Sequence, residues 1–192
     1  DFSAINVWEE GIKVDPAYSG NYYNAANYYF YAKDKVWSLI YGEIFINMES
    51  LGERGAAMKQ QLLQGYKEKL FTETDLLKGE EKNKSEFAKR YLETIGKQSS
   101  LVNAGVNIDV LTMVRTRFIL DWYNSNATLY PFRLFYFHRQ LLSEGLFDAY
   151  NHWLFGPVEN LAAYDNWIKT HTEEYNNFSA FQKTRIFRMP QG

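Results

Sequence analysis

The sequence contains no cysteine, which excludes disulfide frameworks, thiolate zinc sites and cysteine nucleophiles. It also has no excess of one charge, because 21 Lys and Arg residues are balanced by 23 Asp and Glu residues. The net charge of −2 leaves no basic field that would hold nucleic acid or an anionic membrane. No apolar run reaches the roughly 18 residues of a membrane-spanning helix, so we expect no transmembrane segment.

Proline is scarce as well: the chain has four, and none lies between residues 17 and 130. The Asn-Gly, Asp-Gly and Pro-Gly pairs that are typical of β-hairpin turns are absent. A β-sandwich or barrel needs many such turns, so the sequence predicts an all-α fold. With 192 residues, of which 46% are apolar, the chain is long enough for one packed domain and short for two.

Apolar residues recur at helical spacing through most of the chain. We expect helices over residues 4–12, 22–29, 35–49, 55–71 and 108–123, one from Pro131 to just before Gly145, then one to Gly156, one after Pro157 and one over 175–184. Asp34 is a candidate N-cap, Pro131 suits a first helical position, and Gly145 suits the position just past a helix end. The apolar stripes predict five core aromatic residues: Trp8, Phe45, Phe118, Trp122 and Trp153.

The segment 78–97 differs from the rest because half of its residues are charged. These charges predict two favourable i,i+4 ion pairs, Glu86–Arg90 and Glu93–Lys97. A single apolar seam remains, made by Phe87, Tyr91 and Ile95. We therefore expect a solvated helix here, followed by a loop from about 98 to 107.

A repeat-like pattern occupies the first fifty residues. Small, aromatic, small, aliphatic and proline residues follow one another at Ala4, Trp8, Gly11, Ile12 and Pro16. This pattern resembles the second helix of a tetratricopeptide repeat, in which small residues let two helices approach closely and proline ends the helix. Residues 22–29 resemble the first helix of the next repeat, and residues 131–156 resemble the same repeat more weakly.

Two further segments resemble an uncharacterised family of exported bacterial helical proteins. They are Gly20-Asn-Tyr-Tyr-Asn24 and the stretch from Gly145 to Pro157, which is followed by Trp167. The resemblance implies an exported origin, as a periplasmic protein or a surface lipoprotein, and it implies no activity. We expect an upstream segment to precede Asp1, while a cytoplasmic location stays open.

These patterns predict one all-helical domain over residues 1–192, built from antiparallel helical hairpins. The expected architecture is a tetratricopeptide-like right-handed array with a non-repeating middle, and the alternative is an irregular all-α bundle. The parts would be repeat-like at 1–50, irregular at 51–130, hairpin-like at 131–156 and helical again at 157–192.

Tyrosine and asparagine gather between Asn21 and Tyr31, in a chain that holds 34 aromatic residues. On a helix, Asn24, Asn27 and Tyr31 share one face, with Tyr23 beside them. Rigid amphipathic rings next to two-way hydrogen-bonding amides make good recognition surfaces. The alternative is that the tyrosines of this segment belong to the repeat core.

A second candidate site consists of Glu43 and Asn47, one turn apart on an apolar helix, together with Arg115. A buried carboxylate opposite a guanidinium would form a bidentate pair. Such a group could hold a ligand or act as an acid or base. The alternatives are a structural ion pair, or exposure of all three side chains.

Signals for enzymatic or metal chemistry are weak. Asp148 and His152 stand at i,i+4, but no HExxH or other multi-ligand pattern accompanies them, and we expect His152 to pack beside Tyr150 and Trp153. The Gly-rich phosphate loops and the Gly-x-Ser-x-Gly elbow are absent, so no cofactor and no catalytic residue is predicted. An enzyme that uses Glu43 stays as one hypothesis.

The favoured hypothesis is a non-enzymatic helical-repeat module that binds a protein or peptide through an aromatic, asparagine-rich surface. The alternative is a cell-surface protein that binds a glycan or small ligand, because Tyr and Trp rings stack on sugars. Nucleic acid is not an expected partner.

Overall fold

The computed structural model describes residues 2–73, 75–78 and 84–191, and within these residues every regular element is a helix. The predicted all-α class is thus confirmed. The chain divides into two compact units, residues 1–72 with 187–192 and residues 73–186, and each is described by itself below. The single domain over residues 1–192 stays a prediction.

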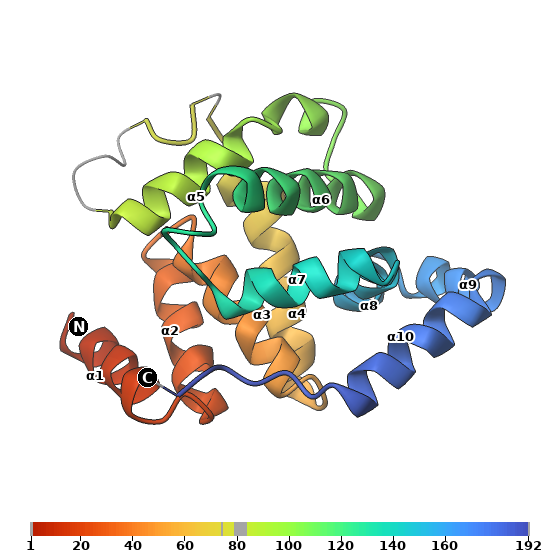
Figure 1. The fold of residues 1–192 in the computed structure, drawn as a ribbon, viewed down its shortest axis with the longest axis horizontal. Coiled ribbons are helices and arrows are strands. Elements are labelled where there is room, and N and C mark those ends of the chain that lie inside the picture. The colour runs from red at the N-terminus through yellow and green to blue at the C-terminus, as the bar shows by residue number, and fades with distance from the viewer. Residues whose placement is uncertain (1, 74, 79–83, 192) are drawn as a thin grey trace. The chain divides into compact units, whose positions relative to one another are not determined.

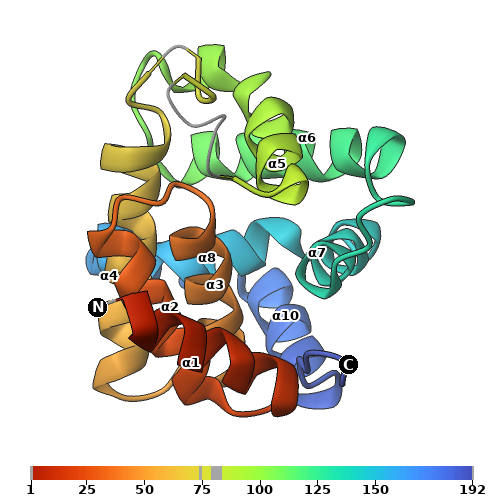
Figure 2. The same ribbon diagram turned by 90° about the vertical axis from the view of Figure 1, so that its left-hand side faces the viewer.

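The first unit holds four α-helices and a short π-helix that continues the last of them (Figure 1). These are α1 (Phe2–Val14), α2 (Ser19–Tyr31), α3 (Trp37–Met48), α4 (Glu53–Gln64) and the π-helix η1 (Gly65–Leu70). Figure 2 shows α1 to α4 side by side, and each packs against its neighbour in the chain. The last two elements together cover the helix that was predicted over 55–71.

Small residues bring these helices close together. A Cβ atom added at Gly11 would lie 2.4 Å from the Asn21 amide, so α1 approaches α2 more closely there than a larger residue permits. Ala25 and Ala26 are fully buried, and a Cβ atom at Gly42 of α3 would lie 3.9 Å from the Ala26 Cβ. Small residues thus occupy the α1–α2 and α2–α3 contacts.

The turn between α2 and α3 forms as the sequence predicts. Lys33 has a left-handed backbone with a φ of 61°. The Asp34 carboxylate accepts hydrogen bonds of 2.8 Å from the backbone N–H groups of Val36 and Trp37. Asp34 therefore satisfies two donors in the turn before α3, but the helix begins at Trp37 with Val36 in the N-cap position, so the predicted cap lies two residues too early.

The second unit contains the remaining helices: α5 (Glu86–Gly96), the 3₁₀-helix η2 (Ser99–Val102), α6 (Ile108–Ser125), α7 (Arg133–Ser143), α8 (Phe147–Glu159), α9 (Leu161–Thr170) and α10 (Thr172–Thr184). Asn107 caps α6 and Asn160 caps α9, since each amide oxygen accepts a backbone N–H three residues on. Helix α8 packs against α6, α7, α9 and α10. It is the central element of this unit.

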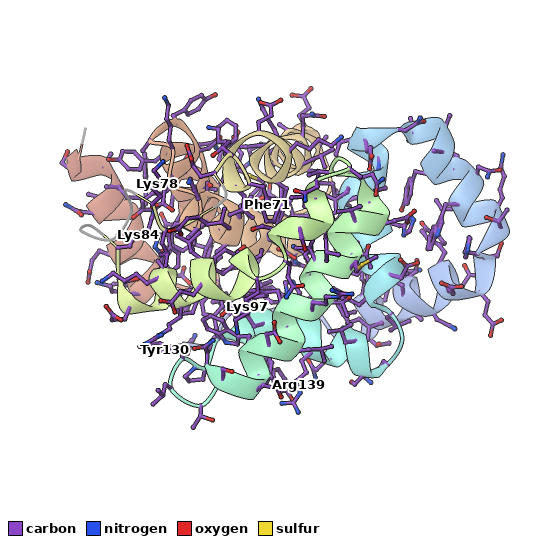
Figure 3. The ribbon with its side chains drawn as sticks, turned by 90° about the horizontal axis from the view of Figure 1, so that it is seen from above. Phe71, Lys78, Lys84, Lys97, Tyr130 and Arg139 are labelled. Carbon is purple, nitrogen blue, oxygen red and sulfur yellow. The ribbon has the colours of Figure 1, made fainter. Side chains whose placement is uncertain are left out.

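An aromatic cluster fills the core between α5, α6 and α7. The fully buried indole of Trp122 has the rings of Phe87, Phe118 and Phe135 around it, with centroid distances of 5.0–5.6 Å. Tyr130, labelled in Figure 3, lies at the edge of the cluster, 6.4 Å from Trp122. Aromatic burial therefore holds the three helices together.

Cation–π contact adds to the α6–α7 packing at the surface. Arg139 of α7, also labelled in Figure 3, places its guanidinium 4.4 Å from the centroid of the Tyr123 ring on α6. Such a contact contributes about 0.5–1 kcal/mol at an exposed site.

The two predictions based on proline near α7 and α8 are wrong in detail. Helix α7 begins at Arg133 rather than at Pro131, because Phe132 takes extended backbone angles. Helix α8 continues through Pro157 to Glu159 and ends only at Asn160, whose backbone is again extended. Gly145 lies just past α7 with a φ of 70°, as predicted.

The charged segment 78–97 also differs from its prediction. Helix α5 starts at Glu86, capped by the Ser85 hydroxyl, and residues 79–83 lie outside the described part of the chain. The ion pairs form at i,i+3, Glu86–Lys89 and Arg90–Glu93, each at 2.9 Å, instead of the predicted i,i+4 pairs. Both pairs are solvent-exposed, so they add little to stability.

Two of the five predicted core aromatics are half-buried instead. Trp8 makes an edge contact with Tyr28, with ring centroids 6.5 Å apart, and keeps part of its surface exposed. Trp153 stacks on Tyr150 and meets Phe178, yet keeps part of its surface exposed. In contrast, Phe45, Phe118 and Trp122 are buried as predicted. None of the described helices is both long and apolar enough to span a bilayer.

Candidate functional site

The Tyr/Asn face on α2 is divided between surface and packing. Asn24 is exposed and Tyr31 is 78% exposed, so both are available to a partner. Asn27 donates its amide to the Tyr23 carbonyl oxygen at 2.9 Å. The Tyr23 ring lies 5.0 Å from Phe45 and makes a packing contact. Of the four predicted residues, Asn24 and Tyr31 are the most accessible.

Glu43 and Asn47 lie on α3 in the first unit, and Arg115 lies on α6 in the second. Glu43 is buried, with 3% of its surface exposed, and its backbone oxygen accepts the Asn47 amide at 3.0 Å. Since Arg115 belongs to the other unit, a pocket shared by the three residues stays a prediction.

Arg115 has a partner that the sequence analysis missed. Its Nε donates to the Asn151 Oδ1 at 2.7 Å, and the Asn151 amide nitrogen donates to the Phe147 carbonyl oxygen at 2.7 Å. Its guanidinium also lies over the rings of Phe147 and Phe155. Arg115 and Asn151 are buried, so the pair joins α6 to α8 inside the second unit.

A pocket of about 500 Å³ opens in the second unit, where the start of α6, the end of α8 and the whole of α9 meet. Its lining combines rings, amides and carboxylates. These residues are Asn107, Ile108, Asp109, His152, Glu159, Asn160, Ala163, Tyr164, Asn166, Trp167, Thr170 and His171. A volume of this size suits a small ligand.

Three parallel rings form one wall of this pocket. The His152 imidazole lies 4.2 Å from the Trp167 ring at 10°, and the His171 imidazole lies 4.9 Å from the same ring at 8°. His152 is buried, while Trp167 and His171 are half-buried. A ligand in the pocket can therefore touch the accessible parts of the Trp167 and His171 rings.

Hydrogen bonds hold the histidines in place. His152 Nδ1 lies 3.0 Å from the Asp148 carbonyl oxygen, and His171 Nδ1 lies 3.1 Å from that of Trp167. The prediction that His152 packs beside Tyr150 and Trp153 is wrong, because its ring stacks on Trp167 of α9 instead. In the described residues, no group of three or more His, Cys, Asp or Glu side chains is placed to bind a metal.

The polar groups of the pocket carry negative charge. Asp109 and Glu159 supply two carboxylates, and no Lys or Arg is among the lining residues. The amide oxygens of Asn107 and Asn160 are occupied as helix caps, at 2.9 and 3.0 Å from backbone nitrogens. Burial, with Tyr175 and Asp165 nearby, raises the pKa of the Tyr164 phenol to about 12, so this phenol stays neutral at pH 7.

This pocket was not predicted from the sequence, although part of its lining follows a local pattern. Trp167 and His171 stand one turn apart, a spacing that places two rings on the same helix face. The rest of α9 and its cap residue add further lining, but only the tertiary fold brings the start of α6 and the α8 residues His152 and Glu159 to them. No family model, curated protein or solved structure matches this chain.

Proposed function

We propose that this chain is a non-enzymatic binding protein whose second unit holds a small polar ring, such as a sugar unit of a glycan, in the α8–α9 pocket. The observation that carries the proposal is the wall of parallel rings beside carboxylate and amide groups. Sugars present an apolar C–H face and a rim of hydroxyl groups. The accessible parts of the Trp167 and His171 rings suit that face, and the exposed Asp109 and Asn166 suit the hydroxyls.

Charge narrows the class of ligand. Because the lining includes two carboxylates and neither Lys nor Arg, we expect it to disfavour an anion such as a phosphate or a sugar acid. Neutral sugars avoid this repulsion and can donate hydroxyl hydrogens to the carboxylates. We therefore expect glucose-type units to bind in preference to the matching uronic acids.

A glycan array, followed by titration of glucose and glucuronate in a thermal-shift assay, tests the proposal. We expect retention of neutral glycans, a melting-temperature rise with glucose, and no rise with glucuronate. Trp167→Ala and Asn166→Ala should weaken binding, whereas Asp165→Ala, an exposed change on the same helix outside the pocket lining, should leave it unchanged. Binding of no neutral glycan, or cleavage of a bound one, would contradict the proposal.

A second candidate function is binding of a protein or peptide through Asn24 and Tyr31 on α2. The specific support is their exposure on one helix, together with the exposed side chains of Val14 and Tyr18 at the preceding turn. In this proposal α1 to α4 form a tetratricopeptide-like right-handed array, supported by the small residues at the contacts of α1, α2 and α3.

Crosslinking in native cells, with and without Asn24→Ala/Tyr31→Ala, tests this second function. A partner that is captured by the unchanged chain and lost from the double variant would support it. Capture that is equal for both proteins would place the partner elsewhere.

We further propose that binding takes place outside the cytoplasm, as the resemblance of the segment from Gly145 to Pro157 implies. Fractionation of native cells with an antibody against the chain tests this. Recovery in the cytoplasmic fraction alone would contradict it.

A further inference from the structure

A carboxylate in the first unit is held among aromatic rings from three helices. Glu9 lies on α1 and is half-buried. The Tyr29 hydroxyl of α2 donates to Glu9 Oε1 at 2.7 Å, and the Tyr41 hydroxyl of α3 donates to the same oxygen at 3.3 Å. The two phenols therefore fix the position of the carboxylate.

This carboxylate has no cationic partner within the described part of the chain. Both of its hydrogen bonds end on Oε1, and no Lys, Arg or His side chain pairs with it. The neighbouring Glu10, which is exposed, pairs with Lys13 at 3.2 Å. A partly desolvated charge is costly unless an opposite charge or hydrogen bonds compensate it. Glu9 is thus a half-buried negative group whose Oε2 takes no part in either of these hydrogen bonds.

The surrounding rings form a continuous aromatic surface. The Trp37 ring stacks on Tyr41 at 5.2 Å, the Tyr29 and Tyr41 rings lie 6.0 Å apart, and Tyr28 meets Tyr29 edge-on at 5.5 Å. All four rings are half-buried, so each keeps part of its surface accessible. The combination of aromatic faces and one carboxylate attracts organic cations.

The phenols are suited to remain donors beside the carboxylate. Burial first, and then the negative charge of Glu9, raises the pKa of the Tyr41 hydroxyl far above its ordinary value. Burial and the hydrogen bond to Glu9 raise the pKa of the Tyr29 hydroxyl in the same direction. Both phenols are thus neutral at pH 7. Glu9 is the carboxylate that both phenols hydrogen-bond, while Asp34, whose charge also acts on Tyr29, accepts the backbone N–H groups of Val36 and Trp37.

We propose that Glu9 and the rings of Tyr28, Tyr29, Trp37 and Tyr41 bind an organic ammonium group. The ammonium would lie against the accessible ring surfaces, with its charge next to Glu9 Oε2. Two sources carry this chemistry: a free quaternary ammonium compound and the lysine side chain of a peptide. This site is separate from the α8–α9 pocket, so it can stand if the sugar proposal fails.

The first test compares choline with 3,3-dimethylbutan-1-ol, its neutral isostere, by titration calorimetry on the whole chain. We expect choline to bind about tenfold more tightly than the alcohol, because only choline gains from the carboxylate and the ring faces. Equal binding of the two compounds, or binding of neither, would overturn the proposal for free ammonium compounds.

The lysine arm uses the peptide acetyl-Gly-Lys-Gly-amide and the same peptide with its lysine side chain acetylated. We expect the charged peptide to bind and the acetylated peptide not to bind. If neither choline nor the charged peptide binds better than its neutral counterpart, the proposal as a whole is overturned. Preference for one of the two cations identifies the source.

Variants then locate the binding. Glu9→Gln keeps the shape and an acceptor for the phenols but removes the charge, so we expect cation affinity to fall about tenfold. Glu10→Gln, one residue away, should leave it unchanged. If Glu9→Gln fails to fold, Tyr41→Phe serves instead. This change keeps the ring and frees Oε1 from one donor, so we expect the variant to retain the preference for choline over the alcohol. Full cation affinity in a folded Glu9→Gln protein would refute the assignment.

Discussion

Trp122 offers a test of how packing and hydrogen bonding combine in the core of the second unit. Its indole is fully buried among the rings of Phe87, Phe118 and Phe135, and its Nε1 is buried without a hydrogen-bond partner in the described chain. Trp122→Ala removes the whole ring and should lower the free energy of unfolding by about 3–5 kcal/mol.

Trp122→Phe should cost far less. The smaller ring loses burial worth about 1–2 kcal/mol, but the change also removes a buried N–H group whose lack of a partner costs about 1–3 kcal/mol. The two effects nearly cancel, so we expect a net change within about 1 kcal/mol. Urea unfolding at pH 7, followed by circular dichroism, measures both variants through the shift in midpoint at constant slope.

Trp153→Phe is the matched control, because it removes the same atoms from a half-buried indole. By burial alone, Trp122→Phe should be the more destabilising of the two. The unpaired N–H predicts the opposite order. A loss above about 2 kcal/mol for Trp122→Phe, larger than the loss for Trp153→Phe, would refute the reasoning.

Further outcomes concern a helix contact and a buried cation. Gly156→Ala would bring a Cβ atom within 2.5–3.1 Å of the Tyr164 ring, so it should destabilise α8–α9 packing by about 1–3 kcal/mol. Thermal melts measure this loss, with Gly96→Ala as the control. Its Cβ would lie 3.7 Å from Leu76, so this change should be neutral or stabilising. An equal loss of stability in the two variants would contradict this account. Burial lowers the pKa of Lys59 to about 8, so the unfolded chain binds more protons between about pH 8 and the ordinary lysine value. The free energy of unfolding should therefore rise across that interval, and Lys59→Met should flatten the rise; an unchanged slope in urea titrations at pH 8, 9 and 10 would show that Lys59 is not its source.

Much of the fold could be predicted from local sequence signals. Helical spacing gave the positions of most helices, and Gly145 lies where capping preferences predict, while Asp34 accepts backbone N–H groups just before α3 without occupying its N-cap position. The predictions from Pro131 and Pro157 failed because backbone angles at Phe132 and Asn160 set the helix ends instead. Proline permits a helix boundary without requiring one at a particular residue.

The sites were harder to predict because side-chain partners depend on tertiary packing. Arg115 lies near an apolar seam that helical spacing reveals, but its partner Asn151 is 36 positions away and no local pattern points to it. The sequence suggested a metal ligand or a packed ring for His152, while its actual neighbour is Trp167 on the next helix. The shared helix face of Asn24 and Tyr31 was easier to predict, since it follows from their spacing alone.

The central claim is that the α8–α9 pocket is a binding site for a neutral sugar ring. Nuclear magnetic resonance of the indole N–H signals tests it most directly, because the chain has five tryptophans and one of them, Trp167, lines the pocket. Titration with glucose should shift the Trp167 signal and leave the buried Trp122 and the first-unit Trp8 unmoved. No shift at Trp167, or an equal shift from glucuronate, would contradict the claim.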